Sequence, residues 1–292
     1  MSAVVQAAGL EPVPGYRLSV RRFARNRLAL AGLVVVVLFL LFCFVGPLLY
    51  STDQTHTDLG QVNLAPSAAH WLGTDAVGHD ELGRLMYGGR VSLLVGLAAG
   101  VLATVIGTLW GSLAGYTGGW VDAVMMRVVD AGIAIPALFI LLVVSAIATP
   151  GIPGLILILG LVSWLVPSRL VRAETLTLKN RDYVLTLRAI GGTHGRAILR
   201  HILPNSVSTI VVAATFQVAD AILLVAYVSY LGLGVQPPST DWGGMLSAGL
   251  TAAYSGRWWL IVPPGLAIIL VVCAFNAVGD GLRDAFDVRG RA

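Results

Sequence analysis

The sequence predicts an all-α membrane protein with about six transmembrane helices. Its 292 residues are 57% hydrophobic and only 12% charged, with a mean hydropathy of +0.83, whereas soluble domains carry about 25% charged residues. The apolar residues gather in uncharged runs, and about 20 such residues cross a bilayer as a helix. The basic residues lie beside these runs, which indicates membrane topology, so nucleic acid is not an expected partner.

The first span is predicted at residues 28–50. This run of 23 residues follows an arginine-rich start. It is longer than the roughly 7–15 apolar residues of a signal peptide. We therefore expect it to be retained as a transmembrane helix.

The other spans follow from longer apolar stretches. Residues 91–121 are uncharged and predict the second span. Residues 131–168 are too long for one helix, and two prolines and two glycines within 148–154 divide them into a third and a fourth span. The fifth and sixth spans are predicted at 206–231 and 258–279. Glycines at four-residue steps give the second span surfaces for close helix packing: Gly96 and Gly100, then Gly107, Gly111 and Gly115.

The basic residues orient these spans. With the N-terminus inside the cell, 16 of the 19 basic residues fall on the cytoplasmic side and three fall outside. The reverse topology exchanges these numbers. Because cytoplasmic loops carry the excess of Lys and Arg, both termini are predicted in the cytoplasm.

This topology divides the chain into segments. A cytoplasmic arginine-rich segment, a first transmembrane helix and an extracytoplasmic loop precede a core of five transmembrane helices. The core contains a cytoplasmic loop and a second extracytoplasmic loop, and a cytoplasmic tail follows it. Both outer loops mix aromatic and apolar residues with turn formers, which predicts ordered structure. In the order given, the bounds are residues 1–27, 28–50, 51–90, 91–283, 168–205, 232–257 and 284–292.

Two acidic residues lie in or beside the predicted spans. An ionisable group inside a membrane is costly to bury and is therefore a candidate functional residue. Asp130 is predicted at the cytoplasmic boundary, paired with Arg127 three residues earlier. For Asp220 two alternatives stay open, because it can line a polar pathway or bond to a neighbouring helix.

The cytoplasmic loop holds a basic amphipathic stretch, YVLTLRAIGGTHGRAILRHILPN, at residues 183–205. The stretch predicts two short helices joined by a glycine turn. Asp182 or Asn180 is expected to cap the first helix. Gly191 and Gly192 are expected to end it, since glycine readily takes the left-handed conformation found after a helix.

The second helix of this pair is predicted at residues 194–203. Thr193 is placed to cap it, and Pro204 is expected to end it. Apolar residues at helical spacing predict an inward face, and arginines predict a face toward water or a partner. The inward residues are Val184, Leu187, Ile190, Ile198, Leu199, Ile202 and Leu203, and the outward arginines are Arg188, Arg196 and Arg200.

Residue chemistry alone leaves the role of this stretch open. It can lie on an anionic membrane surface or dock into a partner protein. The single lysine, Lys179, is followed by Asn180, so the chain cannot form the Gly-Lys-Ser/Thr loop that binds nucleotide phosphates. It also lacks the zinc-protease and serine-hydrolase motifs.

Several stretches resemble the C-type permease subunits of bacterial dipeptide and oligopeptide ABC importers. They are RRFARNRLALAGL, HWLGTDAVGHDELGRLMYGGRVSL, GGWVDAVMMRVVDAGIAIPALFILL and SYLGLGVQPPSTDWGGML, in that order along the chain. The cytoplasmic stretch, with RAIGG and HILPN at the family's spacing, resembles the signature loop of these permeases. Three positions depart from the pattern: residues 185–187 (Leu-Thr-Leu) replace the usual Glu-Ala-Ala, His79 replaces arginine, and Val225 replaces a frequent glutamate.

The resemblance implies a type I ABC importer permease fold in the bacterial cytoplasmic membrane. It implies four kinds of neighbour: a homologous B-type permease, two cytoplasmic ATPases that bind ATP and magnesium, an extracytoplasmic binding protein and the lipid bilayer. No cofactor is expected in this chain. The implied ATPase-coupling residues are Asp182, Tyr183, Leu187, Arg188, Ala189, Gly191, Arg196, Arg200, Leu203 and Pro204. Oligopeptides or dipeptides are the expected cargo, with nickel complexes, glutathione and antimicrobial peptides as alternatives carried within the same family.

Two other function classes are weaker. A proton-coupled secondary transporter could use Asp220, but the sequence shows neither an inverted repeat nor a pair of broken helices. A membrane enzyme needs a nucleophile and base or a metal site, and the sequence offers neither. The chain is therefore expected to be a transport subunit and not an enzyme.

Overall fold

The computed structural model describes residues 15–51, 55 and 57–286 as a bundle of helices. This part of the chain holds no β-strand, only an isolated bridge between Thr74 and Asp80. The start of the predicted N-terminal segment, 1–14, and the end of the predicted tail, 287–292, lie outside the described residues. The all-α prediction is confirmed.

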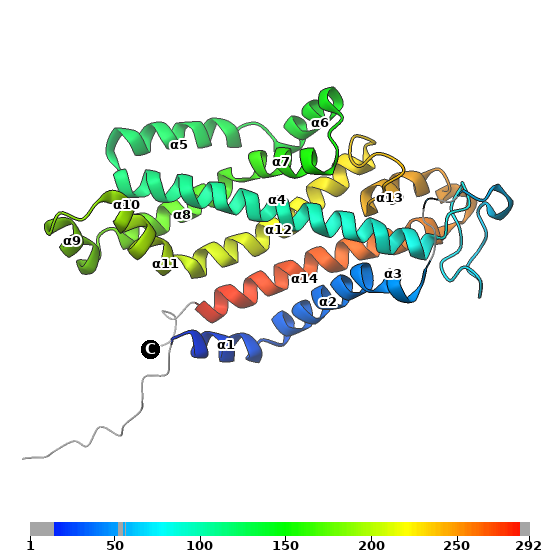
Figure 1. Cartoon of the computed structure of the whole chain (residues 1–292), viewed down its shortest axis with the longest axis horizontal. Helices are drawn as coiled ribbons and strands as arrows, with labels where there is room; N and C mark the ends of the chain where they lie inside the picture. The colour runs from blue at the N-terminus through cyan, green and yellow to red at the C-terminus, as the bar shows by residue number, and fades with distance from the viewer. Residues whose placement is uncertain (1–14, 52–54, 56, 287–292) are drawn as a thin grey trace, which may run out of the picture.

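Four long apolar helices run along the length of the molecule (Figure 1). The central one has 37 residues and at 1.5 Å per residue is about 55 Å long. It packs against two of the other long helices, which also pack against α14. The four are α2 (Arg27–Phe44), α4 (Glu81–Thr117), α12 (Val207–Tyr230) and α14 (Val262–Phe286).

Two more spans are bent pairs of helices. α5 (Gly119–Ile133) and α6 (Ala137–Ala148) meet at 75°, and α7 (Ile152–Ser163) and α8 (Leu165–Leu178) meet at 46°. Pro136 precedes α6 and has no N–H to continue the ladder of α5. The four straight helices and two bent pairs give up to six spans, which confirms the predicted number. The sequence is expected to contain no pair of broken helices, and this expectation is wrong, because the structure contains two bent pairs.

The remaining helices are short. One precedes the first span, four form the helix pair described below, and the other five lie in the loops that follow α2 and α12. They are α1 (Gly15–Arg25), α3 (Gly46–Leu49), η1 (Leu59–Gln61), α9 (Asp182–Ala189), α10 (His194–Ala197), η2 (Ile198–Ile202), α11 (Leu203–Asn205), α13 (Trp242–Leu250), η3 (Ala253–Ser255) and η4 (Trp258–Leu260).

The second span begins earlier than its predicted start at residue 91. α4 begins at Glu81, and Asp80 caps it by accepting a 2.8 Å hydrogen bond from the Gly83 amide. The arginines of this segment read as loop residues in the sequence. Arg90, however, donates to the Cys43 and Phe44 carbonyls at the end of α2, which satisfies part of its guanidinium within the helix bundle. The loop predicted at 51–90 therefore ends ten residues sooner.

The fourth span continues beyond its predicted end at residue 168. α8 extends to Leu178 although it carries arginines. Arg172 makes two hydrogen bonds of 2.5 and 2.6 Å to Asp122 of α5, and Arg169 pairs with Asp130. Because each arginine finds an acid on the neighbouring helix, helical structure persists where the uncharged run stops. The predicted pair of Asp130 with Arg127 is replaced by the pair with Arg169.

The glycines of α4 are packing positions, as predicted. A Cβ atom added to Gly100 would lie 2.8 Å from the backbone of Val218 in α12. One added to Gly111 would lie 2.2 Å from the Ser168 carbonyl oxygen in α8. Both distances are too short for any side chain, so glycine permits these helices to meet backbone to backbone. The contacts lie within this chain.

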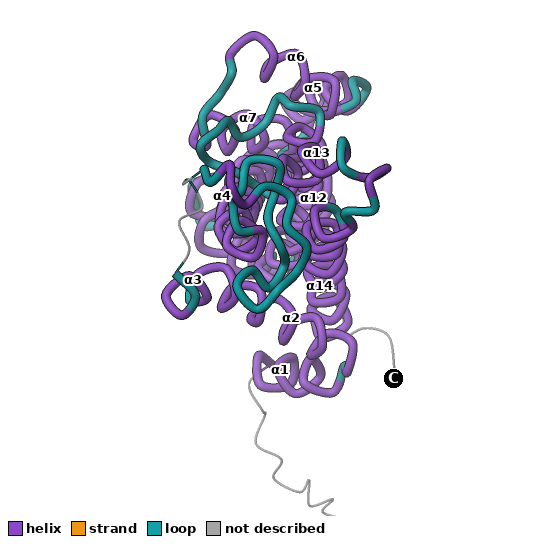
Figure 2. The backbone as a smooth tube through the Cα atoms, turned by 90° about the vertical axis from the view of Figure 1, so that its right-hand side faces the viewer, coloured by secondary structure: helices purple, strands orange, loops and turns teal. Residues whose placement is uncertain are grey.

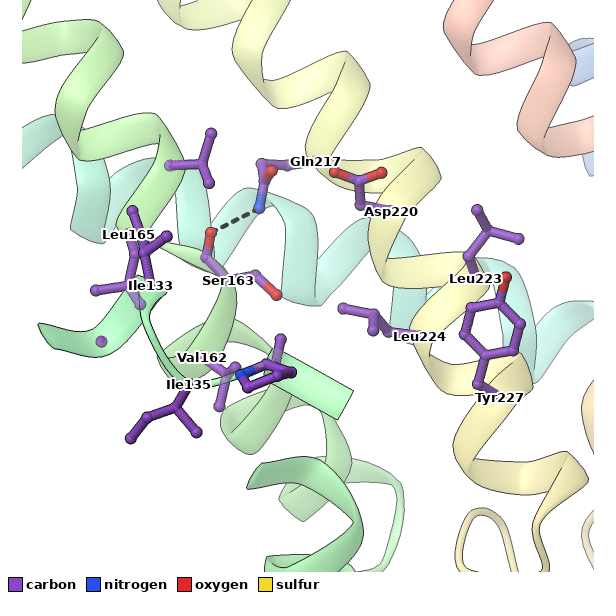
Figure 3. A pocket seen from close by; sticks show the side chains of 14 residues that line it. Ile133, Ile135, Val162, Ser163, Leu165, Gln217, Asp220, Leu223, Leu224 and Tyr227 are labelled. Carbon is purple, nitrogen blue, oxygen red and sulfur yellow. Dashed lines mark hydrogen bonds between the residues drawn. The ribbon is translucent and has the colours of Figure 1, made fainter. Parts of the chain in front are cut away.

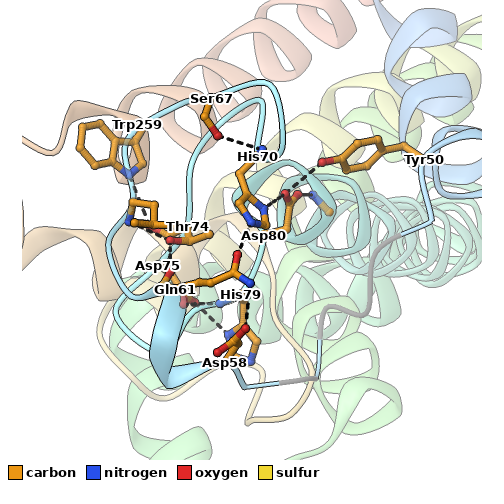
Figure 4. A network of polar contacts seen from close by, with 12 residues as sticks. Tyr50, Asp58, Gln61, Ser67, His70, Thr74, Asp75, His79, Asp80 and Trp259 are labelled. Atoms are coloured by element: carbon orange, nitrogen blue, oxygen red, sulfur yellow. Dashed lines mark hydrogen bonds and ion pairs between the residues drawn. The ribbon is translucent and has the colours of Figure 1, made fainter.

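A polar network orders the outer loop before α4 (Figure 4). The His70 ring bridges Asp80, 2.9 Å from Nδ1, and Gln61, 2.6 Å from Nε2. Tyr50 donates to Asp80 across 3.0 Å, which ties the loop to the end of the first span. Figure 2 looks onto this end of the molecule and shows the loop lying over the helix ends. In its described residues the loop is held in place by this network, which agrees with the prediction of ordered structure.

His79 and Asp75 form a second part of this network. The Asp75 carboxylate accepts from Arg84 across 2.7 Å and lies 2.9 Å from Nδ1 of His79. Burial raises the pKa of Asp75, but the amides of Val77 and His79, the His79 ring and Arg84 together hold that pKa below its usual value. His79, which stands where the resembling family has arginine, therefore still provides a hydrogen-bond partner for Asp75.

Candidate functional site

The basic stretch folds as a pair of helices at the end of the molecule opposite the loop that precedes α4 (Figure 1). α9 leads into a turn at Gly191, whose φ of +80° lies in the left-handed region. α10, η2 and α11 follow as the second helical segment. The predicted helix–glycine–helix arrangement is confirmed.

The two helices begin differently. Thr193 caps α10 as predicted, since its hydroxyl accepts from the Arg196 amide at 3.3 Å. The N-cap of α9 is Arg181, with no side-chain hydrogen bond. The predicted caps are wrong, because Asp182 lies in the first turn and Asn180 donates back to the Leu176 carbonyl of α8.

The second helix passes through Pro204 instead of stopping there. Residues Ile198–Ile202 form a π-turn, in which the Leu203 amide bonds to the Ile198 carbonyl. A π-turn shifts hydrogen-bond partners by one residue, and the chain accommodates the proline ring and continues to Asn205. The prediction that the helix ends at Pro204 is therefore wrong, because the helical segment continues to Asn205.

The inner face of the pair packs on the ends of α4 and α8. Val184, Ala197 and Ile202 are fully buried, in a cluster with Tyr116 and Leu178. Leu187, Ile198 and Leu203 are half-buried around them. This small core fixes the helix pair to α8 and to α4, the longest helix of the bundle.

Tyr116 is the centre of that attachment. Its ring lies 5.3 Å from the His194 ring and 5.9 Å from the Arg188 guanidinium carbon. Lys179 donates to the Gly115 carbonyl one residue earlier, across 2.8 Å. Displacement of the pair therefore has to move the end of α4.

The outer face of the pair is exposed, apolar and basic. Ile190 is 76% exposed and Leu199 is 65% exposed, although both were predicted to face inward. Val184 on the first helix and Ala197 and Ile202 on the second take the buried positions, so Ile190 and Leu199 stay in the open. We define the coupling surface as the exposed residues Tyr183, Leu185, Arg188, Ile190, Arg196, Leu199 and Arg200. Three other predicted coupling residues, Asp182, Ala189 and Pro204, are exposed beside it.

A second candidate site is a cavity of about 330 Å³ between α12 and the two bent pairs (Figure 3). Gln217 donates from α12 to the Ser163 carbonyl at the end of α7, across 2.8 Å. Asp220 lies one turn further along α12 and lines the cavity. Within the described residues Asp220 has no hydrogen bond or ion pair. The bond to a neighbouring helix is made by Gln217, which favours the alternative that Asp220 lines a polar pathway.

The bends that form this cavity were not predicted. Gly132, Ile135 and Pro136 line it at the break between α5 and α6, and Leu165 lines it at the break between α7 and α8. Pro136 was the available signal in the sequence, but the uncharged run around it read as one helix. Val225, where the resembling family often has glutamate, is fully buried on the same helix and leaves Asp220 as the acid of this region.

In the described part of the chain, no group of three His, Cys, Asp or Glu side chains is placed to hold a metal ion.

The sequence matches two family models and several known proteins. Residues 107–291 match the family model described as the binding-protein-dependent transport system inner membrane component, and residues 16–66 match that of the N-terminal transmembrane domain of oligopeptide transport permease C. A protein of Brucella suis biovar 1 (strain 1330), named as a peptide permease, is 45% identical over 93% of this chain and 90% of its own length. The oligopeptide transport system permease protein OppC of Escherichia coli (strain K12) is 41% identical over 93% of this chain and 90% of its own. The dipeptide transport system permease protein DppC of Bacillus subtilis (strain 168) is 38% identical over 93% and 85%.

Proposed function

The chain belongs to the family of binding-protein-dependent transport system inner membrane components, and from this membership we propose that it is the C-type permease subunit of a bacterial ABC importer for peptides. The relatives named for oligopeptide and dipeptide transport cover nearly the whole chain. Their names support peptides as the cargo. The family places the protein among multi-pass membrane transport subunits, and we assign it to the bacterial cytoplasmic membrane.

The proposed machine contains partners that supply what this chain lacks. A homologous permease completes the pathway, two cytoplasmic ATPases bind ATP and magnesium, and an extracytoplasmic protein delivers the peptide. The single lysine cannot form a phosphate-binding loop. The energy for transport must therefore enter through a contact with another chain.

The coupling surface is the observation that carries this proposal. It is exposed, and its opposite face is fixed to the ends of α4 and α8. An exposed amphipathic helix that is rigidly attached to long helices can transmit a partner's movement into the bundle. Closure of the ATPases would displace α9 and α10, and the small core around Tyr116 would pass that displacement to α4.

Co-purification tests the proposal. The chain is tagged, expressed with the products of its neighbouring genes, extracted in mild detergent and weighed as an intact complex. We expect a second permease and two ATPases in the complex, and ATP-dependent peptide uptake after reconstitution with the binding protein. A chain that purifies alone contradicts the assembly. Uptake that survives loss of the ATPases but stops when the proton gradient collapses would indicate a secondary transporter that uses Asp220.

A further inference from the structure

Resting on the proposed function, we propose that the cavity beside Asp220 binds the protonated α-amino group of the peptide cargo during its passage. Asp220 is the fourteenth of the 24 residues of α12. At 1.5 Å per residue it lies about 20 Å from the start of the helix, which is near mid-span. A cargo group bound there would be held midway across the membrane.

The backbone at this level is interrupted on two neighbouring elements. α5 ends at Ile133 and α7 ends at Ser163, while α6 begins at Ala137 and α8 begins at Leu165. Residues at all four ends line the cavity. The Ser163 carbonyl accepts from Gln217 and the Gly132 carbonyl accepts from the Ile135 amide, so these helix ends are satisfied within the chain. In membrane transporters, interrupted helices of this kind are tolerated where they line a cavity.

The charge in the cavity is uncompensated. Of the 14 residues that line it, Asp220 is the only acid, and none is basic. An acid inside a membrane is costly unless it is paired or hydrated. A cation that enters the cavity therefore gains the attraction of Asp220. A cationic ligand fits this site, and an anionic ligand does not.

The size and lining of the cavity indicate a peptide terminus as the cation. A volume of about 330 Å³ is at the lower end of the range of small-molecule sites, about 300–1,000 Å³. The walls are mainly apolar, and Leu223 and Leu224 follow the acid on α12 (Figure 3). Every unmodified peptide has an α-amino group whatever its side chains. A site that reads this group therefore accepts peptides of any sequence but requires a free N-terminus.

The test compares trialanine with N-acetyl-trialanine as cargo for the complete reconstituted transporter. Uptake is measured with the binding protein saturated by each peptide, so that its own selectivity does not enter the comparison. We expect the wild-type complex to prefer trialanine about tenfold or more. Asp220→Asn should remove most of that preference by lowering trialanine uptake, and Asp220→Glu should retain it.

Asp280→Asn is the matched control, because Asp280 is an exposed acid near the far end of α14. It should leave the preference unchanged. An Asp220→Asn complex that assembles and keeps the wild-type ratio of the two uptake rates would overturn the inference. So would a wild-type complex that takes up both peptides equally. Neither result affects the proposed function, which fails only if no ATP-dependent peptide uptake occurs at all.

Discussion

Gly191 determines the turn between α9 and α10. Its φ of +80° places it in the left-handed region, where a side chain costs about 1–2 kcal/mol and a β-branched side chain costs more. No other atom lies within 4 Å of the position a Cβ would take. A substitution here therefore acts on the backbone and not through a clash.

We predict that Gly191→Val changes the angle between α9 and α10 and reduces ATP-driven peptide uptake about tenfold or more, while ATP hydrolysis continues. The measurement is the ratio of peptide taken up to ATP hydrolysed in proteoliposomes. Gly195→Val is the matched control, since Gly195 also has open space around it but lies within α10 at ordinary helical φ. Equal ratios for the two variants and the wild type would show that the turn does not transmit coupling.

Asp241 gives the outer end of the protein a pH-dependent stability. It is fully buried, caps α13 through the Gly244 amide at 2.8 Å and accepts from Ser229 across 2.6 Å. Burial outweighs these hydrogen bonds and raises the pKa of Asp241 from 3.8 to about 6. A raised pKa in the folded state means that the folded protein binds the proton more tightly than the unfolded chain.

This contribution of Asp241 to stability is complete below pH 3.8 and is lost as the pH rises through about 6. Two pH units correspond to a free energy on the order of 3 kcal/mol. We predict that the melting temperature of Asp241→Asn falls less between pH 5 and pH 7 than that of the wild type. The asparagine amide keeps the hydrogen bonds of Asp241 but has no charge to bury. Thermal unfolding in detergent measures this, with Asp280→Asn as the control. Parallel curves for wild type and Asp241→Asn would contradict the assignment.

Helix packing depends on α4, where glycine brings two other helices into backbone contact. We predict that Gly111→Ala lowers stability by several kcal/mol, because the new methyl group would lie 2.2 Å from the Ser168 carbonyl oxygen and would separate α4 from α8. Gly265→Ala is the control within α14, where the nearest atom lies 3.7 Å away. Alanine is favoured over glycine in a helix by about 1 kcal/mol, so this variant should be as stable as the wild type or more stable.

Melting temperatures of Gly111→Ala and Gly265→Ala in the same detergent test this prediction. A Gly111→Ala protein as stable as Gly265→Ala would mean that α4 and α8 are not held at this distance. Assembly with the partner subunits provides an independent measure, because both bent pairs pack around α4 and its displacement would alter the whole bundle.

The elements differ in how far the sequence predicts them. Apolar length and the prolines and glycines near residue 150 place the helices correctly, and four-residue glycine spacing identifies the packing face of α4. Helix ends are harder. Arg172 ends an uncharged run, but its partner Asp122 lies 50 residues away, and no local pattern reveals that pair. The π-turn before Pro204 and the bends around the Asp220 cavity likewise depend on tertiary packing, although Pro136 marks one of them.

At the scale of the whole molecule, one end carries most of the exposed charge. The coupling surface presents three arginines among exposed apolar residues, and the one acid beside it is Asp182. Its proposed partner on the ATPase should therefore be a groove with an apolar floor and acidic rim, because opposite charges steer association and fix its orientation.

We predict that Arg196→Glu with Arg200→Glu weakens binding of the ATPases about tenfold or more and reduces the dependence of that binding on salt. Both side chains are exposed, so the change should leave the fold intact. Binding is measured by titrating the purified ATPases onto the permease pair in nanodiscs at low and high ionic strength. Arg21→Glu is the control, since Arg21 is also exposed but lies on α1.

Three outcomes separate the two roles that the sequence leaves open for the basic stretch. Loss of ATPase binding by the double variant alone indicates protein docking. Unchanged ATPase binding together with weaker attachment to anionic lipid would return the stretch to the membrane surface. Equal losses with Arg21→Glu would indicate that net charge, and not the coupling surface, controls assembly. The position of the stretch favours the first outcome, because α9 lies at the extreme end of the molecule, beyond the ends of the long helices (Figure 1).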